Sequence, residues 1–75
     1  MTQRGLAWTV EAWGEEREGG RWEGWIVFGP ADGGPLLATG RETTQSNRAA
    51  LGYWARGLEE IYLEGALARA VSRAA

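Results

Sequence analysis

Two rows of side chains alternate through residues 6–14 of the chain. One row is apolar throughout, and its members are Leu6, Trp8, Val10 and Ala12. A repeat of two residues is typical of a β-strand, in which successive side chains point to opposite faces. Residues 21–29, centred on the apolar run Trp25 to Phe28, and the shorter segment 36–42 have the same character. The pattern therefore predicts three strands.

Turn-forming residues separate the predicted strands. The charged stretch Glu15 to Glu18 is followed by Gly19-Gly20, and a Gly-Gly pair can take the positive φ angles that a tight hairpin needs. Residues 29–35 are rich in Gly and Pro and predict a second turn. Because both connections are short, we expect an antiparallel meander with strand order 1-2-3.

The second half of the chain has a helical pattern. Thr43, Thr44 and Ser46 all offer side-chain oxygens that can cap a helix start. Apolar residues recur at helical spacing as Leu51, Trp54, Leu58, Ile61 and Tyr62. We expect one helix from about residue 46, buried along Leu51, Trp54, Leu58 and Ile61, either continuous or bent at Gly65. The predicted fold is a single α+β domain over residues 1–75, a three-stranded antiparallel meander followed by a C-terminal helix.

Both faces of the predicted sheet carry apolar residues, but one helix can cover only one of them. Trp13, Trp25 and Val27 belong to the face that would stay open, and Leu63 and Leu67 lie outside the main helical stripe. These five residues are our candidate dimer interface. The alternative is that the tail after Gly65 folds back over the open face.

Composition favours a partner over other sources of stability. The chain has 75 residues, no Cys and no His, so disulfides and the common zinc sites are excluded. A domain this small gains stability from a second subunit. Without a signal-like start or a long apolar run, we expect a cytoplasmic protein with no membrane partner. All eight basic residues are Arg, and Asn, Gln and Met are scarce, which fits a heat-tolerant source.

The residues that usually carry catalysis are largely absent. Ser46 and Ser72 are the serine nucleophiles, and the chain supplies neither an imidazole nor a Lys amine as a base. The Glu15 to Glu18 cluster is typical of a solvated turn rather than of a metal site. We therefore expect no enzyme, no cofactor and no metal. The five Trp residues could stack on bases, but a net charge of −2 favours roles in the core and in an interface.

One segment resembles a known family. Thr43-Thr44-Gln45-Ser46-Asn47-Arg48-Ala49-Ala50-Leu51 is similar to the segment that opens the first helix of ribonuclease H, and residues 23–40 resemble that family's second and third strands. The family's metal-binding Glu is replaced here by Ala50, and its first-strand Asp falls in the region of Trp13. The resemblance implies a truncated ribonuclease H-like fold without nuclease activity. It also implies that Thr44, Asn47 and Arg48 lie near nucleic acid.

The layout also resembles small domains of the HicB antitoxin type, which look like truncated ribonuclease H folds and associate as dimers. We therefore expect a non-enzymatic interaction or regulatory module that binds a second copy of itself or another protein. The alternative is a nucleic-acid-binding domain derived from a ribonuclease H-like fold. A third hypothesis is an enzyme subunit that another chain completes.

Overall fold

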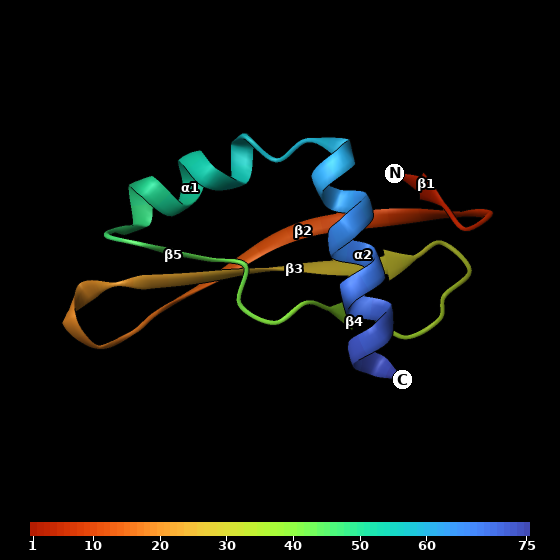
Figure 1. Ribbon diagram of the computed structural model, residues 1–75, viewed down its shortest axis with the longest axis horizontal. Helices are drawn as coiled ribbons and strands as arrows, with labels where there is room; N and C mark the ends of the chain where they lie inside the picture. The colour runs from red at the N-terminus through yellow and green to blue at the C-terminus, as the bar shows by residue number, and fades with distance from the viewer.

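A computed structural model describes all 75 residues as a five-stranded antiparallel sheet with two helices (Figure 1). The strands are β1 (Thr2–Gln3), β2 (Leu6–Glu16), β3 (Trp22–Pro30), β4 (Leu37–Ala38) and β5 (Thr43–Gln45). The helices are α1 (Arg48–Arg56) and α2 (Glu60–Ala74), and a 3-10 turn, η1 (Glu18–Gly20), closes the β2–β3 hairpin. The α+β class and the antiparallel sheet are confirmed. None of the helices is long and apolar enough to cross a membrane.

The long hairpin of β2 and β3 forms the centre of the sheet. Its register runs without a break from Trp8 opposite Pro30 to Glu16 opposite Trp22. Gly19 and Gly20 both have positive φ angles, 76° and 74°, as predicted from the Gly-Gly pair. The prediction missed β1, which pairs with the start of β2 through a turn at Arg4 and Gly5, again with positive φ at both residues.

The predicted third strand, residues 36–42, is wrong in its details because this part of the sheet is divided into β4 and β5. Both pair with the same edge of β3, with Ala38 opposite Val27 and Thr43 opposite Gly24. The distance from Gly24 to Val27 is three residues along β3, whereas the distance from Ala38 to Thr43 is five residues along the paired segment. The two extra residues make the segment between β4 and β5 bulge away from β3. The Ile26 N–H finds a hydrogen-bond acceptor at this bulge in the side chain of Thr39, whose Oγ1 lies 3.0 Å away.

The single predicted helix is wrong, since two helices are joined by a connection at residues 57–59. Of the two alternatives at Gly65, the structure has the continuous one, because Gly65 lies within helix α2. The N-cap of α1 is Asn47, and its Oδ1 accepts a hydrogen bond of 2.8 Å from the Ala50 N–H.

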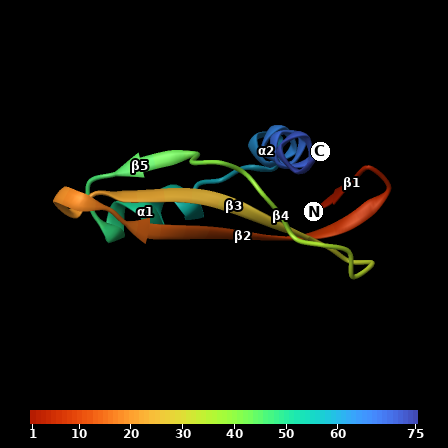
Figure 2. The same ribbon diagram turned by 90° about the horizontal axis from the view of Figure 1, so that it is seen from below.

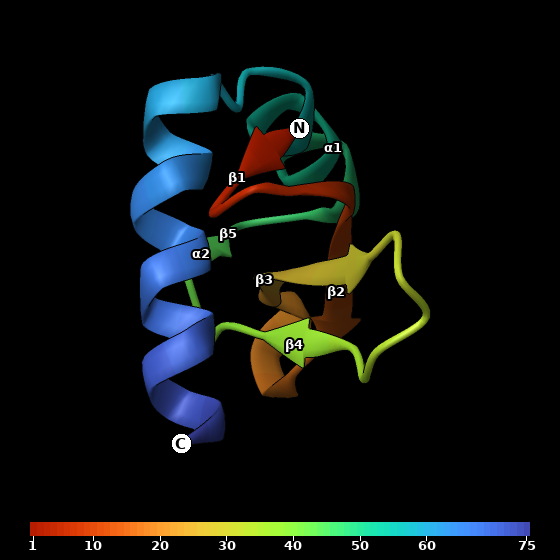
Figure 3. The same cartoon turned by 90° about the vertical axis from the view of Figure 1, so that its right-hand side faces the viewer.

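Both helices pack on the face of the sheet formed by the even-numbered residues of β2 and β3. The core under α2 is the cluster Trp8, Ile26, Phe28, Ala66, Leu67 and Ala70. Ala66 and Ala70 are fully buried and lie one turn apart, so the small side chains bring the α2 backbone close to the sheet. Figures 2 and 3 show α2 lying along this side of the sheet.

Leu51 attaches α1 to the same face near the tip of the hairpin. Its Cδ1 atom lies only 2.7 Å from the place where a Cβ on Gly24 would be, and Gly14 is approached in the same way. These glycines allow the helix to sit directly on the strands. Of the predicted stripe, Leu51 is buried, Trp54 and Leu58 are partly buried, and Ile61 is 78% exposed. The prediction is wrong for Ile61 because the break at residues 57–59 changes the direction of the helix.

Candidate functional site

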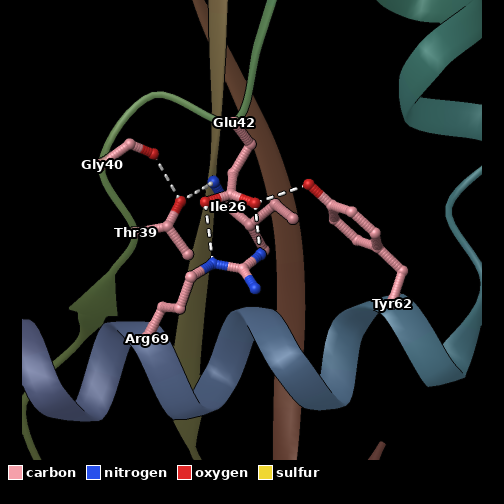
Figure 4. A network of polar contacts seen from close by, with 6 residues as sticks. All are labelled: Ile26, Thr39, Gly40, Glu42, Tyr62 and Arg69. Carbon is pink, nitrogen blue, oxygen red and sulfur yellow. Dashed lines mark hydrogen bonds and ion pairs between the residues drawn. The ribbon is translucent and has the colours of Figure 1, made fainter.

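A network of polar side chains fixes α2 to the segment between β4 and β5 (Figure 4). Glu42 accepts a hydrogen bond of 2.5 Å from the Tyr62 hydroxyl and is also paired with the Arg69 guanidinium. The hydrogen bond to Glu42 raises the pKa of Tyr62 above its ordinary value of 10.0, and burial adds to the shift. The hydrogen bond from Arg69 to Glu42 likewise raises the pKa of Arg69. The Glu42 side chain is only 9% exposed, so this network is a structural clamp.

The odd-numbered residues of β2 and β3 form the opposite face of the sheet, which we call the open face. Trp13 and Trp25 lie opposite each other in the register on this face, and Trp13 is 50% exposed. Val27 follows on β3, between Glu11 on one side and Ala38 on the other. Since both helices pack on the even-numbered face, this face keeps an aromatic pair without a covering element.

The remaining residues of the predicted dimer interface lie elsewhere. Leu67 is 1% exposed and belongs to the core of the single chain, so it is not available to a partner. Leu63 is partly buried against the same core. Val27 itself is only 9% exposed, because larger side chains on the open face surround it. The half-exposed Trp13 and the partly buried Trp25 are therefore the interface candidates that remain on the open face.

A groove of about 690 Å³ lies where α1 ends and α2 begins, and we call it the α1–α2 groove. Its lining is mainly aromatic and aliphatic: Tyr53, Trp54, Leu58, Ile61 and Tyr62. Tyr53 and Ile61 are 77% and 78% exposed, which is unusual for large apolar side chains on adjacent helices. Glu59 is the one charged residue in the lining, and it forms no ion pair in the chain.

A second groove, of about 520 Å³, lies between α1 and the hairpin, and we call it the tryptophan groove. Trp13, Trp22, Trp54 and Arg48 contribute to its lining. Of the three residues predicted to lie near nucleic acid, only Arg48 belongs to this groove. Asn47 uses its side-chain oxygen to cap α1, and Thr44 shares the open face with Glu23, its neighbour in the register. The structure thus does not bring these three residues into one site.

The sequence analysis missed the α1–α2 groove because it treated residues 46–74 as one helix. On a continuous helix Leu58, Ile61 and Tyr62 extend one buried stripe, whereas the break exposes the last two. The sequence Arg56-Gly57-Leu58-Glu59 held a signal, since Gly following a basic residue often ends a helix. Gly57 is the C-cap of α1, with φ −90° and ψ 0°.

No group of three or more His, Cys, Asp or Glu residues lies in an arrangement that could hold a metal ion. In comparisons with protein-family models, with curated proteins and with solved structures, nothing matches this chain. The class that the structure defines is therefore a small α+β domain with two helices on one face of an antiparallel sheet.

Proposed function

We propose that this chain is a non-enzymatic interaction module that acts as a homodimer through its open face. The observation that carries the proposal is the Trp13–Trp25 pair on a sheet face that neither helix covers. Two sheets pack face to face at a distance of about 10 Å, and paired aromatic side chains fill that space well. A second copy of the same face buries the pair without any other component.

Analytical ultracentrifugation tests this proposal. We expect the wild-type chain to sediment at twice its mass of 8.2 kDa at micromolar concentration. Trp13→Ser should weaken the dimer by at least about tenfold, because a buried Trp at the centre of an interface is a typical hot spot. Tyr53→Ser is the matched control, since it removes an exposed aromatic ring from the other side of the molecule. A monomeric wild type, or dissociation by Tyr53→Ser alone, would contradict the proposal.

A second candidate function is binding of single-stranded nucleic acid in the tryptophan groove, on a fold that we propose to be a truncated ribonuclease H-like fold. Its support is the position of Arg48, which forms no ion pair and lies in a groove whose lining includes Trp22 and Trp54. Aromatic rings stack on bases and Arg binds phosphate, so the lining suits an exposed single strand. The order of antiparallel strands followed by a helix supports the fold part of this proposal.

Tryptophan fluorescence during titration with a single-stranded oligonucleotide tests this second function. We expect quenching whose binding constant falls as salt increases, and a loss of affinity in Arg48→Gln. Arg4→Gln is the control, since Arg4 also forms no ion pair and lies in the β1–β2 turn. Equal losses in both variants would indicate only a general effect of net charge and would rule out a site at Arg48.

A further inference from the structure

The α1–α2 groove has the dimensions and lining of a small-molecule site. Its volume of about 690 Å³ falls within the range of ligand pockets, roughly 300–1,000 Å³. Aromatic rings come from both helices, with Tyr53 and Trp54 at the end of α1 and Tyr62 in the first turn of α2. The clamp between Tyr62 and Glu42 holds the second wall in place, so the groove does not depend on a ligand for its shape.

The charge in the groove lining determines which sign of ligand charge the groove favours. Glu59 contributes a carboxylate that is exposed, caps no backbone N–H with its side chain and pairs with no Arg. None of the eight Arg residues of the chain is in the lining. An anion entering the groove would meet the Glu59 carboxylate, whereas a cation would find it as a partner.

Aromatic rings in this region already bind a cation within the molecule. The Arg69 guanidinium carbon lies 5.6 Å from the centroid of the Tyr62 ring, within the usual distance for a cation–π contact. The rings of Tyr53 and Trp54 have no such partner in the chain. Both residues line a groove that also carries the Glu59 carboxylate.

From these observations we propose that the α1–α2 groove binds a small organic cation, an ammonium group carried on an apolar body. The apolar lining removes the body from water, the rings contact the ammonium group, and Glu59 balances its charge. A quaternary ammonium group suits this lining, because aromatic rings bind it without any hydrogen bond from the nitrogen. The site is separate from the open face, so the inference goes beyond the dimer proposed above.

A pair of isosteric probes tests the inference directly. Choline and 3,3-dimethylbutan-1-ol have the same shape, but only choline carries a charge. We expect choline to shift the amide NMR signals of residues 53–62 and to bind at least about tenfold more tightly than the neutral alcohol, which corresponds to one good cation–π contact together with the carboxylate. Equal affinity for the two probes, or no shifts at tens of millimolar choline, would overturn the proposal.

Two charge variants locate the site. Glu59→Gln should weaken choline binding severalfold, whereas Glu18→Gln, the same change of charge in the hairpin turn, should leave it unchanged. Tyr53→Leu keeps an apolar side chain at an exposed position, so it should preserve the fold and still lower the preference for choline over the alcohol. If Glu18→Gln weakens binding as much as Glu59→Gln, the groove is not the site. A wild type that is monomeric but binds choline would refute the dimer and leave this inference standing.

Discussion

At the scale of single residues, Glu42 links two turns of α2 to the bulged segment between β4 and β5. Its carboxylate accepts hydrogen bonds from Tyr62, in the first turn of the helix, and from Arg69, near the middle of the helix. Removing one partner of a hydrogen bond to a nearly buried charge costs more than the bond itself contributes. Arg69 is half exposed, however, so solvent weakens that part of the interaction.

We predict that the Tyr62 phenol titrates above pH 10 and that Glu42→Gln moves its midpoint down toward that value. The reason is the hydrogen bond, which favours the protonated phenol and raises its pKa in the folded state. The resulting stability is fully present below the unfolded pKa of about 10 and is lost as the pH rises through the higher folded pKa. Phenolate absorbance of a Tyr53→Phe variant, in which Tyr62 is the remaining tyrosine, measures this midpoint.

The matching stability measurement uses Tyr62→Phe, which removes the hydroxyl and keeps the ring. We expect it to lower the free energy of unfolding at pH 8 by about 1 kcal/mol, the usual contribution of a partly exposed hydrogen bond to a carboxylate. The difference from the wild type should shrink above pH 10. A midpoint that stays unchanged in Glu42→Gln would show that Glu42 is not the cause of the shift.

Asn47 supplies a second prediction at this scale. Asn47→Ala should destabilise the protein by about 1 kcal/mol, because the Ala50 N–H loses its side-chain acceptor at the start of α1. Asn47→Asp should retain most of the stability, since Asp also accepts this hydrogen bond and its charge suits a helix N-terminus. Urea unfolding followed by circular dichroism compares the variants. Equal losses in Ala and Asp would mean that the cap is not what Asn47 contributes.

At the scale of elements, two glycine substitutions with opposite expected effects test the observed helix boundaries. Gly65→Ala should stabilise the protein by about 0.5–1 kcal/mol, because Gly65 lies inside α2 and a new Cβ would meet only the flexible end of Arg69 at 3.4 Å. Gly24→Ala should instead cost about 1–3 kcal/mol, because its Cβ would overlap Leu51 and press on Thr43 and Trp54. Thermal unfolding measures both. Destabilisation by Gly65→Ala would argue for a bend at that position.

The long hairpin was predictable from the sequence because its information is local. The alternation in residues 6–14 and the Gly19-Gly20 pair predict the strand and the turn, and the structure has both. The third strand was not predictable in its details, because its division depends on Thr39 reaching Ile26, a contact between residues 13 positions apart. The spacing of apolar residues in 36–42 does not indicate that Thr39 will bond to Ile26.

In the helical half of the chain, the apolar pattern predicted helix but not where the helix breaks. Leu51, Leu58 and Ile61 keep helical spacing across residues 57–59, so the pattern alone does not reveal that the chain changes direction there. Leu67 was assigned to a surface for a similar reason. The stripe that α2 buries, with Ala66, Leu67 and Ala70, is composed partly of small residues that carry a weak hydrophobic signal.

At the scale of the whole molecule, the sequence predicted one candidate surface and missed another. The open face with Trp13 and Trp25 follows from strand alternation and was expected. The α1–α2 groove depends on the angle between two helices, which is a tertiary property. Predicting that groove required the position of the break at residues 57–59 and the direction of Tyr62, which its bond to Glu42 determines.

The division of the third strand into β4 and β5 has a consequence for how the molecule opens. The core cluster lies under α2, while α1 and the hairpin tip are attached through Leu51 and Trp54. We expect amide hydrogens in α1 and β5 to exchange through a local opening that leaves Ile26 and Phe28 protected, at a free energy at least about 1–2 kcal/mol below that of global unfolding. Native-state hydrogen exchange would show this as two groups of protection factors, and a single uniform group would contradict it. Two groups would mean that this chain comprises two cooperative units, and that the wall that α1 contributes to each groove belongs to the less stable one.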